Sequence, residues 1–298
     1  MIPSELMEQL RYIEIYTLKA VRDHRVGDYR SPIRGRGFDF DQHKRYQHGD
    51  DYRQIDWNVT ARMRTPYVKK DFEEKEMSAI ILADLSRSME FATVDESKRE
   101  LLLEVAATLA FSAASDSMMV GLIGFTDVIE VDLPPRKGLP QVWKILEALW
   151  AVKTISLGTN LLRPLEYLEP RLKRSTLLFC ISDFITHEEI FASRPLNRLV
   201  QKHDFIPVII EDGREEILPK GKGFLRLRDA ERGGEMLFRL SEKQSRRYET
   251  LMRERKVALR RSLYGLNLGH LFLQAGRPYL DSIIGFFLAR KRVRGMKG

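Results

Sequence analysis

Asp84, Ser86 and Ser88 place three oxygen-bearing side chains at every second position of one short segment. One carboxylate and two hydroxyls are hard donors, and no imidazole or thiolate is among them. Such a set suits Mg²⁺ or Mn²⁺ and does not suit Zn²⁺ or Cu²⁺. The segment directly follows the apolar residues 78–83, which are typical of a buried strand. Because ligand sites in open α/β sheets lie beyond the carboxyl ends of the strands, this segment is a candidate metal site.

Two more oxygen donors stand at comparable places further along the chain. Thr159 lies in the loop Gly158-Thr159-Asn160 before a predicted helix, and Asp183 closely follows the apolar residues 177–181. Three loops from one edge of a sheet then offer oxygen ligands to one ion, and Mg²⁺ takes six oxygens while keeping several waters. We predict a Mg²⁺ (or Mn²⁺) site with one position open to a partner's carboxylate, held by Asp84, Ser86, Ser88, Thr159 and Asp183.

The same residues also fit ordinary structural roles. Ser86 and Ser88 can cap the following helix or close a turn, and Asp183 can cap the helix that comes after it. A capping role for the two serines does not account for Thr159 and Asp183 at other strand ends. The metal site is therefore the preferred interpretation.

An alternation of apolar strands and helices begins near residue 78 and must position these loops. Continuous apolar strands separated by helices predict an α/β fold with a mostly parallel sheet and helices on both faces. Strands are predicted at 78–83, 118–125, 128–133, 176–182, 205–210 and 269–274. Helices are predicted at 96–115, 139–151, 161–172, 188–202, 241–262 and 278–290. Two alternating segments around Gly233-Gly234 predict a small β-hairpin insertion at about 220–240.

The residues before the first strand have a different character. A helix is predicted at 4–22, and residues 27–58 are rich in glycine, charge and aromatics, with too little apolar material for a core of their own. We predict three parts: an N-terminal helix and arm at 1–77, the α/β domain at 78–292, and a basic tail at 293–298.

The five candidate ligands resemble those of a known site. An Asp-x-Ser-x-Ser segment after a first strand, a Gly-Thr-Asn loop and a strand-end aspartate are similar to the metal-ion-dependent adhesion site (MIDAS) of von Willebrand factor A domains. The resemblance implies an intact site in which the two serines and the threonine touch the metal and the aspartates act mostly through water. It also implies that an acidic residue of a protein partner completes the metal shell.

The N-terminal part resembles the leader of domain-of-unknown-function family 58 (DUF58), whose bacterial members couple it to an A-type domain. The matching segments are Gly35-Arg36-Gly37, residues 46–51, Ile55-Asp56-Trp57 and residues 67–70. Members are commonly encoded beside AAA+ ATPases of the MoxR type. The resemblance therefore implies an adaptor or chaperone component that works with such an ATPase.

The net charge of +8 comes from the last third, because residues 212–298 hold 21 Lys and Arg against 10 Asp and Glu. Eight of these cations lie on the predicted helix 241–262. Such a helix can attract an acidic protein, nucleic acid or lipid headgroups, or simply be a solvated face.

We predict a Mg²⁺-dependent protein–protein interaction module rather than an enzyme. No general base, nucleophile or Walker A segment accompanies the candidate metal site. Two alternatives stay open. One is a Mg²⁺-dependent hydrolase, since oxygen ligands at strand ends permit one. The other is a nucleic-acid-binding protein that uses the basic C-terminal third.

The location is predicted from what the sequence lacks. Cys180 is the single cysteine and lies within an apolar run, so we predict that it is a small, buried core residue. A chain with one cysteine cannot form an internal disulfide, which is typical of proteins in a reducing compartment. The first residues have no apolar signal segment, and the apolar residues 283–289 are too few to span a bilayer. We expect a soluble cytoplasmic protein.

Overall fold

The computed structural model describes residues 7–14, 43–47, 52–69, 77–90, 97–156, 158–186, 189–213, 215, 223–228 and 235–295. The chain forms two compact units, one of residues 34–76 and one that joins residues 1–33 to residues 77–298. Residues 7–14 are helical, and Leu10 and Ile13 are buried in the core of the larger unit. The helix that we grouped with the arm thus packs within the α/β unit.

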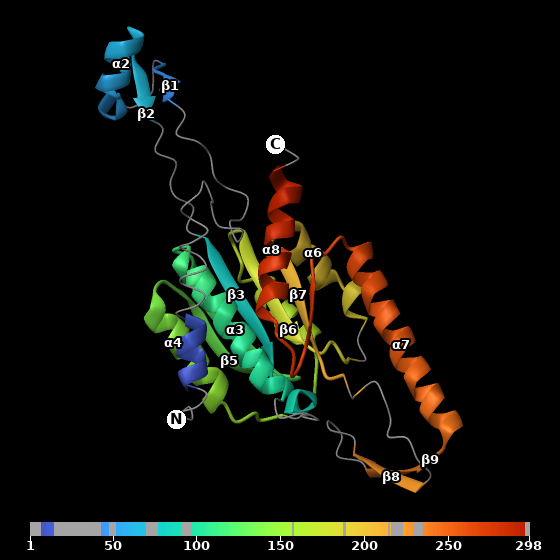
Figure 1. Cartoon of the computed structure of the whole chain (residues 1–298). Coiled ribbons are helices and arrows are strands. Elements are labelled where there is room, and N and C mark those ends of the chain that lie inside the picture. Colours follow the sequence, from blue (N-terminus) through green and yellow to red (C-terminus); the bar gives the residue numbers. More distant parts are fainter. Residues whose placement is uncertain are drawn as a thin grey trace. The chain divides into compact units, whose positions relative to one another are not determined.

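The larger unit is built on a six-stranded sheet with the order β10-β7-β6-β3-β4-β5 (Figure 1). The edge strand β5 runs antiparallel to β4, and the other four pairings are parallel. This is a doubly wound order, which reverses direction at β3. It confirms the predicted α/β fold with a mostly parallel sheet. The strands are β3 (Ser78–Asp84), β4 (Met119–Phe125), β5 (Ile129–Arg136), β6 (Thr176–Ser182), β7 (Asp204–Glu211) and β10 (Leu271–Gln274).

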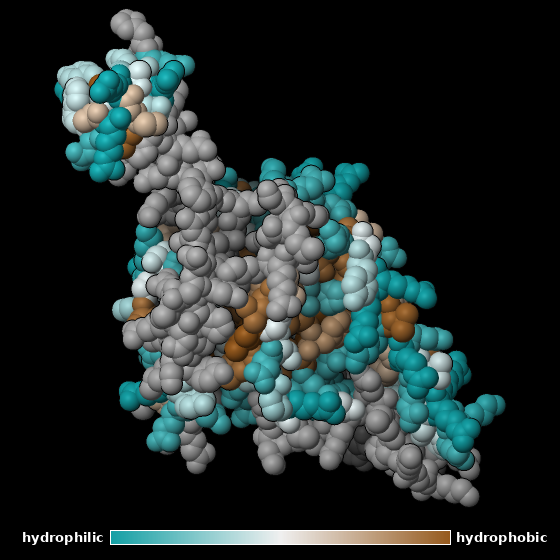
Figure 2. Space-filling model, turned by 45° about the horizontal axis from the view of Figure 1, so that its top comes forward, coloured by the Kyte–Doolittle hydropathy of each residue, from teal (hydrophilic) through white to brown (hydrophobic). Residues whose placement is uncertain are grey.

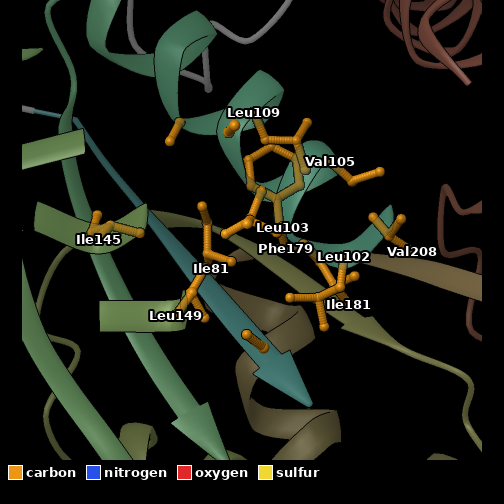
Figure 3. Packing of buried hydrophobic residues seen from close by; sticks show 14 of the residues in the cluster. Ile81, Leu102, Leu103, Val105, Leu109, Ile145, Leu149, Phe179, Ile181 and Val208 are labelled. Atoms are coloured by element: carbon orange, nitrogen blue, oxygen red, sulfur yellow. The ribbon is translucent and has the colours of Figure 1, made fainter. Parts of the chain in front are cut away.

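Alternate residues of the buried strands supply two separate cores, because successive side chains of a strand point to opposite faces. Ile81 of β3 packs with α3 (Lys98–Ser115), α4 (Leu139–Ala151) and α8 (Leu280–Gly295) on one face. Figure 3 shows Leu102, Val105 and Leu109 of α3 over Ile81 and Phe179. The neighbouring residues Ile80 and Leu82 pack with the helices of the other face, α5 (Leu162–Leu168), α6 (Arg194–Lys202) and α7 (Glu242–Gly265).

Most predicted elements are present, and two are corrected: the helix predicted at 161–172 ends at Leu168, and the helix predicted at 188–202 begins later. We predicted a single helix at 188–202, whereas a 3-10 turn (η3, Ile190–Ala192) precedes α6. Ser193 is extended (φ −72°, ψ 144°) and its hydroxyl accepts from the amide of Leu196, so it caps a new helix instead of continuing the first turn. The predicted hairpin is confirmed as β8 (Gly223–Arg228) paired antiparallel with β9 (Glu235–Leu240).

The smaller unit contains a two-stranded antiparallel sheet of β1 (His43–Arg45) and β2 (Tyr67–Lys69). Between them lie η1 (Tyr52–Gln54) and α2 (Trp57–Met63). The side chain of Asp56 caps α2 by accepting from the amides of Asn58 and Val59. Residues 27–42 and 48–51 of the predicted arm lie outside the described residues.

Candidate metal centre

The candidate ligands lie where neighbouring strands end, at the carboxyl edge of the sheet. Ala83 of β3 pairs with Ile181 of β6, which brings Asp84 beside Ser182, and Asp183 follows. On the other side, Asp84 pairs with Phe125 at the end of β4. The segment from Asp84 to Ser88 therefore leaves the sheet between the ends of β4 and β6, at the point where the sheet order reverses.

Asp84 is fully buried, and both of its carboxylate oxygens accept hydrogen bonds. Oδ1 accepts from the amide of Ser86 (2.9 Å) and Oδ2 from the hydroxyl of Ser182 (2.6 Å). Burial raises the pKa of Asp84, the charge of Asp183 raises it further, and the hydrogen bonds from Ser182 and Ser86 lower it, which leaves the pKa at about 6. A positive ion nearby would stabilise the ionised form of this carboxyl.

The two serine hydroxyls face each other, with 3.1 Å between Oγ of Ser86 and Oγ of Ser88. The contact is a hydrogen bond between the two hydroxyls, and its length is close to the roughly 3.0 Å between neighbouring oxygens of a Mg²⁺ octahedron with bonds of about 2.1 Å. The spacing of the hydroxyls and the oxygen-only donor set therefore fit Mg²⁺, or Mn²⁺ of similar size. Neither serine caps a long helix, because the hydroxyl of Ser97 caps α3.

Thr159 lies on a loop that is held against the end of β4. The amide of Asn160 donates to the backbone oxygen of Thr126, the residue after β4 (3.2 Å). Glu130 of β5 holds the same loop by accepting from the amides of Ile155 and Ser156. These contacts bring the Thr159 loop to the same edge as Asp84, one strand away.

Asp183 takes part in a buried ionic cluster that sequence reasoning missed. Nζ of Lys98, at the first turn of α3, is fully buried and lies 2.9 Å from Oδ2 of Asp183 and 2.7 Å from Oε1 of Glu215. The other oxygen of Asp183 accepts from the amide of Ile185 (2.9 Å). Asp183 thus closes a turn after β6 and does not cap the next helix, which settles that alternative.

The charges of the cluster do not balance among its own side chains. Burial lowers the pKa of Lys98, but the charges of Asp183 and Glu215 raise it more, so the group is held as an ammonium. With Asp84, Asp183 and Glu215 ionised, the ammonium of Lys98 leaves an excess of two negative charges, which the guanidinium of Arg99 near Asp84 and Glu90 offsets only in part. A divalent cation would neutralise that excess, and buried charges are costly unless they are compensated.

The sequence does contain a signal that marks Lys98 as unusual. A lysine at the first turn of a helix is unfavourable, because the helix dipole is positive there, and the rest of the buried face of α3 is apolar except for Thr108. Such a lysine calls for an acidic partner. Ser182 is a second missed residue, and its bond to Asp84 follows only from the pairing of β3 with β6.

Two further observations limit the kinds of reaction and metal site that the described residues can support. Cys180 is fully buried and burial strongly raises the pKa of its thiol, which fits the predicted role of a small core residue and not that of a nucleophile. Within the described ranges, no group of three or more His, Cys, Asp and Glu side chains is arranged to hold a metal ion. A site at the carboxyl edge therefore depends on hydroxyl ligands.

In the part of the chain that the structure describes, no helix has both the length and the apolar character needed to cross a membrane. The apolar residues of the C-terminal helix have another use, since Ile283 and Phe287 are buried in the core. They pack α8 against the sheet.

Comparison with known proteins gives one family and several relatives. The family model described as "Protein of unknown function DUF58" matches residues 42–258. The uncharacterized proteins Rv1480 of Mycobacterium tuberculosis and Mb1516 of Mycobacterium bovis are each 26% identical to this chain over 290 residues, which covers 97% of this chain and 90% of theirs. The similarity to these relatives thus extends over almost the whole chain.

Two solved structures are also similar. The conserved hypothetical protein BatB from Bacteroides thetaiotaomicron is 14% identical and gives a TM-score of 0.46, with 73% of this chain and 99% of that chain covered. An aerotolerance-related membrane protein from Bacteroides fragilis is 15% identical and gives a TM-score of 0.43, with 74% and 97% covered.

Proposed function

The chain belongs to the DUF58 family, and from that premise we propose that it is a protein-binding module whose binding depends on Mg²⁺ or Mn²⁺. Asp84, Ser86, Ser88, Thr159 and Asp183 would hold the ion, as in a MIDAS. When bound, the ion supplies a positive centre with an exchangeable position, which a carboxylate from a partner can occupy. The protein itself orders the ligands and keeps Asp84 away from bulk water.

The observation that carries this proposal is the pair of serine hydroxyls beside a buried carboxylate. Ser86 and Ser88 hold their oxygens 3.1 Å apart through a hydrogen bond, close to the roughly 3.0 Å between adjacent Mg²⁺ ligands. Asp84 and Asp183 contribute negative charge at the same edge, and Lys98 offsets only part of it. The site thus has the donors, the spacing and the charge that a small divalent cation requires.

We further propose an AAA+ ATPase of the MoxR type as the partner, with this protein as its adaptor or chaperone component. Support for this step comes from the family resemblance. The ATPase, or a client that it shares with this protein, would offer an aspartate or glutamate to the ion.

The first test measures the metal itself. Isothermal titration of the purified protein with MgCl₂ and MnCl₂ is expected to give one site, which Ser86→Ala/Ser88→Ala removes. A matched control is Ser175→Ala/Ser282→Ala, which deletes two hydroxyls from an exposed turn before β6 and from the exposed face of α8. Unchanged metal affinity in the Ser86/Ser88 variant would contradict the proposal.

The second test measures the partner. A MoxR-type AAA+ ATPase from the same genome is expected to co-purify with the tagged protein in Mg²⁺, and to be lost in EDTA and in Asp84→Ala. Circular dichroism spectra of the variants check that they are folded. Equal recovery of the ATPase with and without EDTA would contradict a metal-dependent interaction.

A further inference from the structure

Helix α7 is longer than the sheet that it covers. Its 24 residues span about 36 Å, whereas the eight residues of the neighbouring strand β7 span about 26 Å. Because α7 connects β7 to the parallel strand β10, its N-terminal end lies on the carboxyl side of the sheet. Figure 1 shows this end running past the strand ends toward the hairpin of β8 and β9.

The inner face of α7 is attached to the same edge that carries the candidate metal centre. Nη2 of Arg255 donates to the backbone oxygen of Phe184, the residue after Asp183 (3.3 Å). The hydroxyl of Tyr248 donates to the backbone oxygen of Glu215 (2.8 Å), and Glu215 binds Lys98. These contacts fix α7 beside the candidate ligands, so a protein that reaches the ion can also touch this helix.

The outer face of α7 is basic and carries exposed apolar side chains. Arg253 and Arg261 lie four residues before and after Val257, so the three share one face, and Tyr264 continues it one turn further on. Val257 is 43% exposed and Tyr264 is 71% exposed. On the side where α7 lies in Figure 1, the surface in Figure 2 is largely hydrophilic.

The cations of this face lack acidic partners within the described residues. Arg246 pairs with Glu242, but no carboxylate in the described ranges pairs with Lys243, Arg247, Arg253 or Arg261. The helix as a whole has eight Lys and Arg residues against three Glu. Unpaired cations on a fixed helix create a positive field that favours a negatively charged partner.

We propose that the outer face of α7 is a docking surface for an acidic, partly apolar segment of the protein that brings its carboxylate to the metal. The arginines attract and align that segment, and Val257 and Tyr264 supply the apolar contacts that charge alone does not. The metal part of this inference rests on the proposed function, whereas the α7 surface can be tested without the metal. An acidic protein is favoured over nucleic acid because an aliphatic residue is exposed at the centre of the basic face.

The test uses a fluorescein-labelled peptide of repeating Glu-Leu-Glu-Glu units and follows its anisotropy with the full-length protein. Arg253→Glu/Arg261→Glu is expected to weaken peptide binding by about tenfold or more, in both Mg²⁺ and EDTA. The matched control Lys173→Glu/Arg174→Glu makes the same change of charge at exposed residues before β6, at the opposite edge of the sheet. It should leave the peptide affinity close to that of the wild type.

Two further arms separate the sources of binding. Val257→Ser should weaken binding of the peptide but not of a single-stranded DNA oligonucleotide of equal length. Calorimetry should show that Arg253→Glu/Arg261→Glu binds Mg²⁺ as the wild type does. If the wild type binds no Mg²⁺, the proposed function is contradicted but the docking surface is not. The effect of Arg253→Glu/Arg261→Glu on peptide affinity in EDTA would still test the α7 surface.

The docking surface is overturned if the wild type binds the acidic peptide no better than a Gln-Leu-Gln-Gln peptide, or if the control variant loses as much affinity as the α7 variant. It is also overturned if the oligonucleotide binds through Arg253 and Arg261 more tightly than the peptide while Val257→Ser changes neither affinity.

Discussion

The buried ammonium of Lys98 is costly in its own right, since it is removed from water and lies at the positive end of a helix dipole. Its hydrogen bonds to Asp183 and Glu215 offset that cost. The lysine thereby stabilises two acidic side chains from different loops when no other cation is near. It also sets how much negative charge remains for a metal to neutralise.

Replacing this lysine should make the fold depend on divalent cations. We expect Lys98→Met to lower the free energy of unfolding in EDTA by roughly 3–5 kcal/mol, because the buried carboxylate of Asp183 and the half-buried one of Glu215 lose their partner. Excess Mg²⁺ should restore part of the loss, since the ion supplies positive charge beside Asp183. Urea unfolding of the variant in EDTA and in Mg²⁺ measures both effects.

A control variant separates this effect from a general loss of lysine. Lys144→Met, on the exposed side of α4, should shift the free energy of unfolding by no more than about 0.5 kcal/mol in either buffer. If Mg²⁺ stabilises Lys98→Met no more than it stabilises the wild type, the ammonium and the metal do not share a site.

For individual residues, the sequence predicted the candidate ligands but not the residues that hold those ligands in place. Asp84 and Asp183 could be found because Asp84 ends the strand β3 and Asp183 directly follows the strand β6. Lys98 is 85 residues away from Asp183, and Ser182 is 98 residues away from Asp84. Such pairs follow only from the packing of α3 and the register of β3 with β6, which a single sequence does not specify.

Among the elements, the loop from Val152 to Asn160 depends on one side chain of the neighbouring strand. Glu130 accepts hydrogen bonds from the amides of Ile155 and Ser156 and from the hydroxyl of Thr126 (2.8 Å). Burial raises the pKa of Glu130, but these hydrogen bonds lower it more, so the pKa lies below its usual range. An ionised carboxylate thus anchors the loop that carries Thr159.

Removing the anchor should loosen the loop more than the fold. We expect Glu130→Ala to weaken Mg²⁺ binding by about tenfold, because Thr159 is no longer held at the carboxyl edge, and to cost roughly 1–2 kcal/mol of stability. Calorimetry and urea unfolding give the two numbers. Glu147→Ala, which removes an exposed carboxylate from α4, should change neither. If Glu130→Ala binds Mg²⁺ with the affinity of the wild type, the position of the Thr159 loop does not affect metal binding.

Element prediction succeeded where a local signal marks both ends of the element. Helix α4 spans the predicted residues 139–151, with Gly138 before it and Pro140 in its first turn. The helix predicted at 188–202 was wrong at its start, because the apolar residues of η3 continue the helical pattern of α6 across the extended Ser193. Hydrophobic periodicity alone does not reveal such a break.

For the molecule as a whole, the α/β unit is assembled from two stretches of chain that the smaller unit separates in sequence. Leu10 and Ile13 lie in the same core cluster as Leu102, Val105 and Phe287. Their burial could be predicted from the apolar pattern of the helix, but not the surface against which it packs. The N-terminal helix is thus part of the fold that positions the candidate metal ligands, although residues 34–76 come between it and β3.

Truncating this distant contact should destabilise the whole α/β unit without touching the candidate ligands. Leu10 is fully buried, so Leu10→Ala should lower the free energy of unfolding by about 2–5 kcal/mol, through lost burial and the cavity that is left. Arg11→Ala, on the exposed side of the same helix, should change it by no more than about 0.5 kcal/mol. Both variants should bind Mg²⁺ as the wild type does under folding conditions. If Leu10→Ala lowers the free energy of unfolding by less than Arg11→Ala does, the N-terminal helix does not belong to the core. The α/β unit would then begin at β3.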